Sequence, residues 1–455
     1  MRTTLCLMVA LALGTGCDRG PSGSGSETPT PTVTPDPVTA PGQGQPQNPA
    51  DSVDPGTETS PTPNSGPPLS FANASNALGF DLYAKARVAA DRAAESGPEN
   101  LAISPASISL AFDMALAGAR GETATEMRRV MHVTGPESAL HDEASRVLGR
   151  LNDPDREDYE LRVVNRLFGE GSFTFDQNYL DLTRTKYLAP LEGVDFRGAP
   201  DGVRGHINGW VAEQTADRIT DLLPPGSVDS DTRLVLVNAI YFLGSWATPF
   251  EESLTRPLPF HLPSGRSVRV PTMHRDGVSG FGRTDGVTVV ELPYVGDELV
   301  MDLIIPDAID GLPAVEERLD AETLSRWVAA VQGYPECSLW LPRFEMRTKV
   351  TLGEHLGALG MTKAFTRRVA DFTGIANPPD PDDRLFISEA FHQVFVAVDE
   401  EGTEAAAATA IVMGSSGGGT PPPPVEVRAD RPFLFVIRER ASGVILFLGR
   451  ITDPR

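Results

Sequence analysis

The sequence predicts an α+β fold built around one large β-sheet. Helical periodicity dominates the first part of residues 69–455, and strand patterns dominate the last part. Residues 233–242 form an apolar run without alternation, which is typical of a central strand covered on both faces. No linker-like change of composition divides residues 69–455, so we expect them to form one domain.

The predicted helices are identified by apolar residues at helical spacing and by capping signals. Leu78, Leu82 and Ala86 share one face of a helix over 75–94. Ser104 is a good N-cap, and Pro105 suits the first helical position because its missing N–H would have no partner there. The same criteria predict helices over 105–118, from 121 onward, and over 177–187, 207–220 and 349–359.

The predicted strands are short segments rich in β-branched and aromatic residues. The longest of them, 385–398, leads directly into an unusual segment, 399–424, that no single ordinary element explains. The strands are predicted over 163–168, 233–242, 287–292, 299–305, 338–344, 385–398, 432–438 and 444–450.

The N-terminal residues 1–17 have the pattern of a bacterial secretory signal peptide. Arg2 precedes the apolar run 5–13, which is too short to span a membrane as a helix. Cys17 follows a small residue and resembles a lipoprotein processing site, where it would become the lipidated N-terminus, although Gly14 departs from the usual leucine or valine. The alternative is a conventional signal peptide cut near Gly16.

Residues 18–68 consist largely of proline, threonine, glycine, serine and aspartate. Such a segment buries too little apolar surface to offset the entropy of ordering it, so we expect a disordered tether. A flexible chain of this length spans roughly 40 Å. The tether would hold the domain 69–455 away from a surface.

Charge and cysteine content exclude several classes of function. The net charge of −23 disfavours binding to nucleic acid or to anionic membranes. Cys6 and Cys17 lie in the predicted signal region, so Cys337 has no partner for a disulfide, and we expect it to be a buried small hydrophobe rather than a reactive thiol. The histidines lack metal-ligand spacing, and we expect no metal and no cofactor.

The segment 399–424 combines a strand-like first half with a second half that cannot be a strand. One alternating set contains no charge and no proline, and Glu404 belongs to the opposite set. Gly402 offers a pivot before the run, whereas glycines and prolines after it exclude a helix and a central strand. Four alanines could also form a short helix. The uncharged set is Thr403, Ala405, Ala407, Thr409, Ile411, Met413 and Ser415.

The G-x-S-x-G pattern at 414–418 does not indicate a hydrolase, because four prolines exclude the helix that must follow its serine. Instead, residues 75–454 resemble the serpin family through a series of motifs in family order. These motifs are NLAISPASI at 100–108, NAIYF at 238–242 with Gly244, Trp246 and Phe250, LPRF at 341–344, LGM at 359–361, ADFTGI at 370–375, EEGTEAAAAT at 400–409 and RPFLF at 431–435.

This resemblance implies a serpin fold with three β-sheets, eight or nine helices and an exposed reactive-centre loop at about 400–428. It also implies a suicide-substrate mechanism, in which a serine protease cleaves the loop, forms an acyl-enzyme and is distorted when the cleaved loop inserts into the main sheet. The implied hinge residues are Glu400, Glu401, Gly402, Thr403, Glu404, Ala405, Ala406, Ala407, Ala408 and Thr409. The implied sheet-opening residues are Ser104, Ser107, Asn238, Trp246 and His392.

Plain structural roles stay open for several of these residues. Trp246 and His392 could simply belong to the core, and Glu400 could be a solvated charge. Leu243, Gln393 and Ala397 depart from residues that are common in the family, but none of them lies in the hinge.

The reactive bond is predicted at Ser416–Gly417 by the family's register. Met413–Gly414 and Ser415–Ser416 are the alternatives. Small and apolar residues before this bond, and the absence of lysine and arginine from 403–427, favour elastase-like or subtilisin-like targets.

The hinge contains no charge or proline at Thr403, Ala405 or Ala407, and this favours an active inhibitor. We expect the inhibitor to have no catalytic residue of its own. The alternatives are a surface-anchored serpin that binds without inserting its loop, and an inhibitor of cysteine proteases. We expect a monomer whose partner is a target protease, with membrane contact only through Cys17. The location would be the cell envelope or the extracellular space.

Overall fold

The computed structural model describes residues 5–14, 70–94, 98–278, 280–333, 337–403 and 425–455. For residues 5–14 and for Thr403 only the backbone is described. All of these residues belong to one compact unit, which contains residues 1–17 and 68–455. The predicted tether 18–68 lies outside the described residues.

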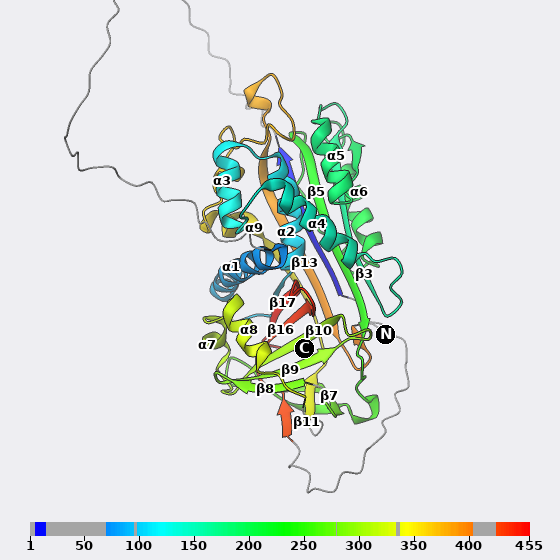
Figure 1. The fold of residues 1–455 in the computed structure, drawn as a ribbon, viewed down its shortest axis with the longest axis vertical. Helices are drawn as coiled ribbons and strands as arrows, with labels where there is room; N and C mark the ends of the chain where they lie inside the picture. The colour runs from blue at the N-terminus through cyan, green and yellow to red at the C-terminus, as the bar shows by residue number, and fades with distance from the viewer. Residues whose placement is uncertain (1–4, 15–69, 95–97, 279, 334–336, 404–424) are drawn as a thin grey trace, which may run out of the picture. The chain divides into compact units, whose positions relative to one another are not determined.

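The largest sheet runs through the length of the domain, and all but one of its neighbouring strands pair antiparallel (Figure 1). Strand β14 (Gly402–Thr403) pairs with β5 beyond the end of β1. The order across the sheet is β12 (Phe344–Thr351), β13 (Phe386–Val398), β1 (Leu5–Gly14), β5 (Thr232–Ser245), β3 (Tyr159–Glu170) and β4 (Leu191–Val194).

Two smaller sheets complete the strand content of the described residues. The six-stranded sheet has the order β2 (Leu101–Ile103), β17 (Ile445–Ile451), β16 (Phe433–Glu439), β10 (Leu299–Pro306), β9 (Val287–Pro293) and β8 (Gly280–Thr284). The four-stranded sheet has the order β15 (Val425–Arg428), β11 (Cys337–Pro342), β7 (Ser267–Asp276) and β6 (Arg256–His261). The fold with three sheets is therefore confirmed.

Nine α-helices occur among the described residues, within the predicted number. Ser104 caps α2 by accepting a hydrogen bond from the Ser107 N–H at 3.2 Å, and Pro105 is the first helical residue, as the sequence predicts. The helices are α1 (Phe71–Ala93), α2 (Pro105–Gly118), α3 (Gly121–Val130), α4 (Glu137–Leu151), α5 (Gln177–Lys186), α6 (Pro200–Gln214), α7 (Leu312–Glu316), α8 (Ala321–Ala329) and α9 (Leu352–Ala358).

Strand β5 has a hydrophobic core on each face, which confirms that 233–242 is a central strand. Its even-numbered positions, such as Leu236 and Ile240, join the main core together with α2, in which every residue is buried. Its odd-numbered positions, such as Val237, pack in a second core that includes Ile207 of α6. Each large apolar side chain buried in this way stabilises the fold by about 1.5–3 kcal/mol.

Two predicted helices have different limits. Helix α6 begins at Pro200 and ends at Gln214, instead of covering 207–220, because Ala216 and Asp217 adopt positive φ angles that no helix can continue through. The predicted helix 349–359 is wrong at its start. Residues 344–351 form β12, in which buried and exposed positions alternate strictly, and only Leu352–Ala358 are helical.

Candidate functional site

Strands β5 and β13 do not pair with each other over the described residues, because β1 lies between them. In Figure 1 the dark blue β1 is seen between the green β5 and the orange β13. β1 is antiparallel to both neighbours, with Val9 opposite Asn238 on β5 and opposite His392 on β13. The main sheet therefore has a position between β5 and β13 that holds one additional strand.

Four of the five predicted sheet-opening residues meet at the middle of this position. The Nε2 atom of His392 accepts a hydrogen bond from the Ser104 N–H at 3.1 Å. The Ser107 hydroxyl donates to the Oδ1 atom of Asn238. All four side chains are buried, and they join the start of α2 to β13 on one side and to β5 on the other.

Asn238 extends this network across the sheet to β3. Its side-chain amide donates to Oδ1 of Asn165 at 2.6 Å, and the Asn165 amide donates to the carbonyl of Tyr187 at 2.7 Å. Asn165 is not predicted as a site residue, because β3 also contains the charged residues Glu160, Arg162 and Arg166, and one more polar residue does not stand out. Because Asn165 pairs with Asn238 in register, the two amides lie beside each other.

The hinge begins as a tight turn at the end of β13. The Oδ1 atom of Asp399 accepts hydrogen bonds from the N–H groups of Glu401 at 3.1 Å and of Gly402 at 3.3 Å. The carbonyl of Gly402 accepts from the Asp399 N–H at 3.2 Å. This turn directs the chain back into the same sheet as β14.

Trp246 holds the hinge turn against the end of β5. Its indole N–H donates to the carbonyl of Asp399 at 3.0 Å, and its backbone N–H donates to the carbonyl of Glu401 at 3.0 Å. The buried indole also stacks on Tyr294, with ring centroids 4.7 Å apart. Trp246 is thus a core residue that also contacts the backbone of the hinge.

Glu400 is buried, so its interpretation as a solvated charge is wrong. Only 2% of its surface is exposed, and its carboxylate accepts hydrogen bonds from the Arg343 Nε at 2.7 Å and from the Thr255 hydroxyl. The Glu400 carbonyl accepts from the Phe250 N–H at 2.8 Å. Arg343 was not identified as a site residue from the sequence, although it lies in the quoted motif LPRF.

Gly402 lies in close contact with β5. Its φ angle of +142° strongly favours glycine, and a Cβ atom would lie 2.6 Å from the Cα of Ser245 and would overlap the carbonyl oxygen of Gly244. This backbone contact places Gly402 opposite Ser245 and Thr403 opposite Gly244. The predicted pivot is therefore the residue at which the chain joins the edge of β5.

The other hinge residues and the predicted reactive bond lie outside the described residues. They are Glu404, Ala405, Ala406, Ala407, Ala408 and Thr409, and the alternatives Met413, Gly414, Ser415, Ser416 and Gly417. Cys17 also lies outside them.

Other sequence features have structural roles. Cys337 is completely buried in the main core, where desolvation raises the pKa of its thiol to about 11. Gln393 lies opposite Lys349 on the neighbouring strand β12, and Lys349 forms an ion pair with Asp221. Among the described residues, no group of three or more potential ligands could hold a metal ion, and no helix is long and apolar enough to cross a membrane.

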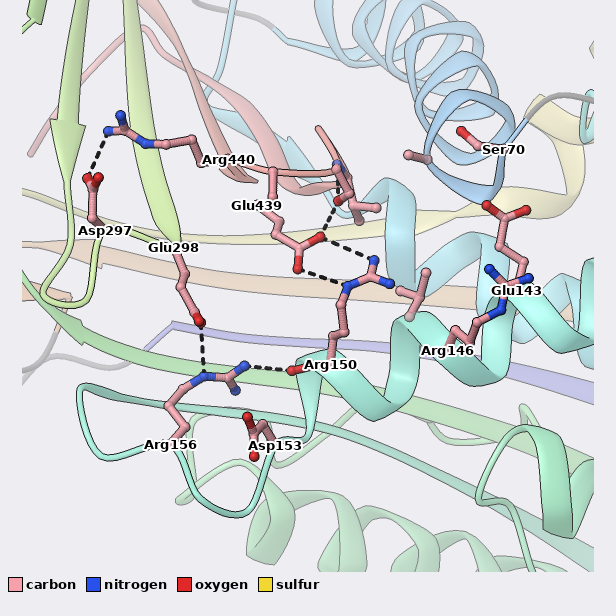
Figure 2. Close-up of a pocket in the computed structure, with 15 residues that line it drawn as sticks. Ser70, Glu143, Arg146, Arg150, Asp153, Arg156, Asp297, Glu298, Glu439 and Arg440 are labelled. Carbon is pink, nitrogen blue, oxygen red and sulfur yellow. Dashed lines mark hydrogen bonds and ion pairs between the residues drawn. The ribbon is translucent and has the colours of Figure 1, made fainter.

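A charged cavity of about 710 Å³ lies between α4, the β9–β10 turn and the β16–β17 turn (Figure 2). Three of its arginines form ion pairs, namely Arg150 with Glu439 at 3.3 Å, Arg156 with Glu298 at 3.5 Å, and Arg440 with Asp297 at 3.0 Å. These pairs engage charged groups that a ligand would need, so we assign no function to this cavity.

The comparison with known proteins agrees with the sheet and hinge described above. The profile of the serpin (serine protease inhibitor) family matches residues 73–454. The chain therefore belongs to the serpin family, which is a family of protease inhibitors rather than enzymes.

Curated relatives are similar over almost their whole length. A leukocyte elastase inhibitor of Bos taurus is 40% identical over 362 residues, which cover 78% of this chain and 93% of the relative. A leukocyte elastase inhibitor of Xenopus laevis is 36% identical and covers 82% of this chain and 97% of the relative. Iris of Ixodes ricinus is 37% identical, with coverage of 78% and 92%.

Solved structures with the same fold include uncleaved and cleaved serpins. Uncleaved ovalbumin has a TM-score of 0.73 and 30% identity, with coverage of 85% of this chain and 100% of that chain. A loop-inserted, cleaved form of an ovalbumin mutant has a TM-score of 0.74 and 28% identity, with the same coverage. The TM-scores to the uncleaved and to the loop-inserted form are almost equal, so the chain shares the fold that is common to both.

Proposed function

We propose that this serpin inhibits serine proteases as a suicide substrate. The serine Oγ of the protease forms an ester with the carbonyl carbon of Ser416, and the Ser416–Gly417 peptide bond breaks. The protease histidine transfers the proton of that serine to the departing amine of Gly417. The loop from Thr403 onward then inserts between β5 and β13, and the displaced, distorted protease cannot hydrolyse the ester.

The single observation that supports this mechanism best is the pairing of β14 with β5. The hinge has re-entered the sheet at Thr403, in an antiparallel register that the following residues can continue. The position between β5 and β13 has room for a strand, because β1 lies there in the same orientation. Loop insertion therefore needs the extension of an existing strand and no new fold.

We propose elastase-like or subtilisin-like proteases as targets. The segment between Thr403 and Val427 contains no lysine or arginine, so it offers no basic side chain to a trypsin-like pocket. Ser416, Ser415 and Met413 are small or apolar, which suits a shallow pocket. Several curated relatives are named as inhibitors of leukocyte elastase.

The test is to mix the mature protein, which begins at Cys17, with pancreatic elastase or subtilisin and to separate the products on a denaturing gel. We expect a covalent complex that survives denaturant, together with a small C-terminal fragment whose mass places the cut at Ser416–Gly417. Elastase without its catalytic serine is the matched control and should form no complex. Cleavage without complex at every molar ratio would contradict inhibition and would support the binding-only alternative. A complex with a papain-like protease alone would support inhibition of cysteine proteases.

We further propose that the protein is an exported bacterial lipoprotein that acts as a monomer. This proposal rests only on the sequence of residues 1–17 and on the composition of residues 18–68. The relatives named above come from animals, so they do not support a bacterial origin. The signal peptide would be removed before Cys17, and the lipid on Cys17 would hold the domain at the cell envelope through the tether. Labelling with a fatty-acid analogue should mark the parent chain and fail to mark Cys17→Ala. Equal labelling would contradict the anchor.

A further inference from the structure

The register of β14 defines where the inserted loop would lie on β5. Gly402 pairs with Ser245 and Thr403 pairs with Gly244, so each further loop residue meets the preceding residue of β5. Continued in this way, Ala405 would lie opposite Phe242. That position is already occupied, because Leu5 of β1 pairs with Phe242.

The coincidence extends along β1. Each residue of β1 up to Leu13 occupies the position of the loop residue whose number is larger by 400, because both strands run antiparallel to β5. The residues of β5 that pair with β1 would therefore pair with the loop after insertion. The equivalent pairs on one face are Leu5 with Ala405, Leu7 with Ala407, Val9 with Thr409, Leu11 with Ile411, and Leu13 with Met413.

The two segments also share the composition that a buried central strand requires. Residues 5–14 contain no charge and no proline, and the uncharged alternating set of the loop contains none either. Because positions that pair directly share a face, Leu5, Leu7 and Leu11 belong to the face of Phe242, Ile240 and Leu236. Those three β5 side chains are buried in the main core. The apolar N-terminal segment thus matches the loop in direction and face.

β1 also passes through the network that must open for insertion. Val9 lies opposite both Asn238 and His392, the two strand residues that are hydrogen-bonded to the start of α2. While β1 is in place, the edges of β5 and β13 satisfy their backbone hydrogen bonds with it. A loop can enter only after β1 has left, since one position cannot hold two strands.

We propose that the N-terminal segment Leu5–Gly14 is an intramolecular block on loop insertion, so that the chain carrying residues 1–17 is cleaved by a protease instead of trapping it. This proposal rests on the proposed inhibitory function. In the blocked chain the acyl-enzyme forms normally, but its ester is hydrolysed before β1 leaves the sheet. Removal of residues 1–16, which include the whole of β1, frees the position between β5 and β13 and makes the inhibitor active.

The test compares three full-length chains made in a membrane-free translation system, in which residues 1–17 are retained. The first is the parent chain. The second carries Leu7→Asp and Leu11→Asp, because two carboxylates cannot be buried in the centre of the sheet. The third, a matched control, carries Val33→Asp and Val38→Asp in the predicted tether. Each chain is mixed with pancreatic elastase, and the ratio of covalent complex to cleaved chain is measured.

We expect the Leu7→Asp/Leu11→Asp chain to give at least a tenfold higher ratio than the parent, with the control equal to the parent. Complex formation at equal ratios in all three chains would overturn the block and leave the inhibitory function standing. Absence of complex from all three would overturn the inhibitory function and the block with it.

Hydrogen exchange of the backbone amides of β5 provides a second measurement that does not depend on the protease. These amides should exchange faster in the Leu7→Asp/Leu11→Asp chain than in the parent. Equal exchange would overturn the block.

Discussion

Thr403 pairs with Gly244 at the end of β5, so the chain that leaves the main sheet through β13 re-enters it only a few residues later. The turn between the two strands is closed by the Asp399 carboxylate and covered by the indole of Trp246. Extension of β14 by continued pairing is therefore the simplest movement available to the cleaved loop.

Thr403→Arg should convert the inhibitor into a substrate. Thr403 already pairs with β5 at one edge, and full insertion would also place β13 at its other edge, where an unpaired buried guanidinium costs several kcal/mol. A barrier raised by about 3 kcal/mol slows insertion roughly 100-fold, so the acyl-enzyme is hydrolysed before the loop inserts. The measurement is the ratio of complex to cleaved chain with elastase. The matched control is Glu401→Arg at an exposed neighbouring residue. Unaltered trapping by Thr403→Arg would contradict the insertion mechanism.

Gly402→Ala should destabilise the hinge turn by about 1–3 kcal/mol, because the φ angle of +142° is strained for any other residue. The added methyl group would also overlap the Gly244 carbonyl oxygen, so β14 must separate from β5. We expect a lower free energy of unfolding and less complex with elastase. Gly209→Ala in α6, where an added Cβ meets nothing within 4 Å, is the control and should stabilise by about 0.5–1 kcal/mol. Equal effects at both glycines would show that Gly402 is not constrained.

Local patterns in the sequence predict the elements of this fold well where one residue type decides the structure. Ser104 and Pro105 fix the start of α2 through capping, and the apolar run in β5 predicts a strand with a core on each face. The sequence predicts a helix from Lys349, because lysine is compatible with a helix, but α9 begins at Leu352. Residues 349–351 belong to β12 because they pair with β13, and this pairing cannot be inferred from local sequence.

The candidate site was predictable only as far as the family motifs extend. His392 and Asn238 were identified through resemblance, but Asn165 was not, since its role depends on its register against Asn238. The burial of Glu400 depends on Arg343 and Thr255, which are distant in sequence. The position of β1 could not be inferred, because an apolar N-terminal run is interpreted first as a signal peptide.

Asn238→Ala should loosen the closed sheet. Asn238 is completely buried and connects Ser107 to Asn165, so its truncation leaves two buried polar groups without their partner. Each such group costs about 1–3 kcal/mol. We expect a lower midpoint in urea unfolding and gradual loss of inhibition on storage, as the loop inserts without cleavage. Asn178→Ala, at an exposed residue of α5, is the control and should change neither. A stable, fully active Asn238→Ala protein would contradict the role of this network.

Asp113 should make the protein less stable as the pH rises. Asp113 is a buried residue of α2, and its Oδ2 atom has no hydrogen-bond partner. Burial raises the pKa of its carboxyl well above the ordinary value of 3.8. At a pH between the ordinary pKa of the unfolded chain and the raised pKa of the folded protein, Asp113 keeps its proton in the folded state and has lost it in the unfolded state. The free energy of unfolding therefore falls with rising pH, by up to about 1.4 kcal/mol per pH unit from this residue.

Asp113→Asn removes this titration while it preserves the shape of the side chain. The free energy of unfolding of Asp113→Asn minus that of the parent should therefore increase as the pH rises from about 4, until the pH reaches the raised pKa of Asp113. Urea unfolding followed at several pH values measures this difference, and Asp310→Asn at an exposed residue is the control, for which the difference should stay near zero. A difference for Asp113→Asn that does not change with pH would show that the carboxyl ionises as freely in the folded protein as in the unfolded chain.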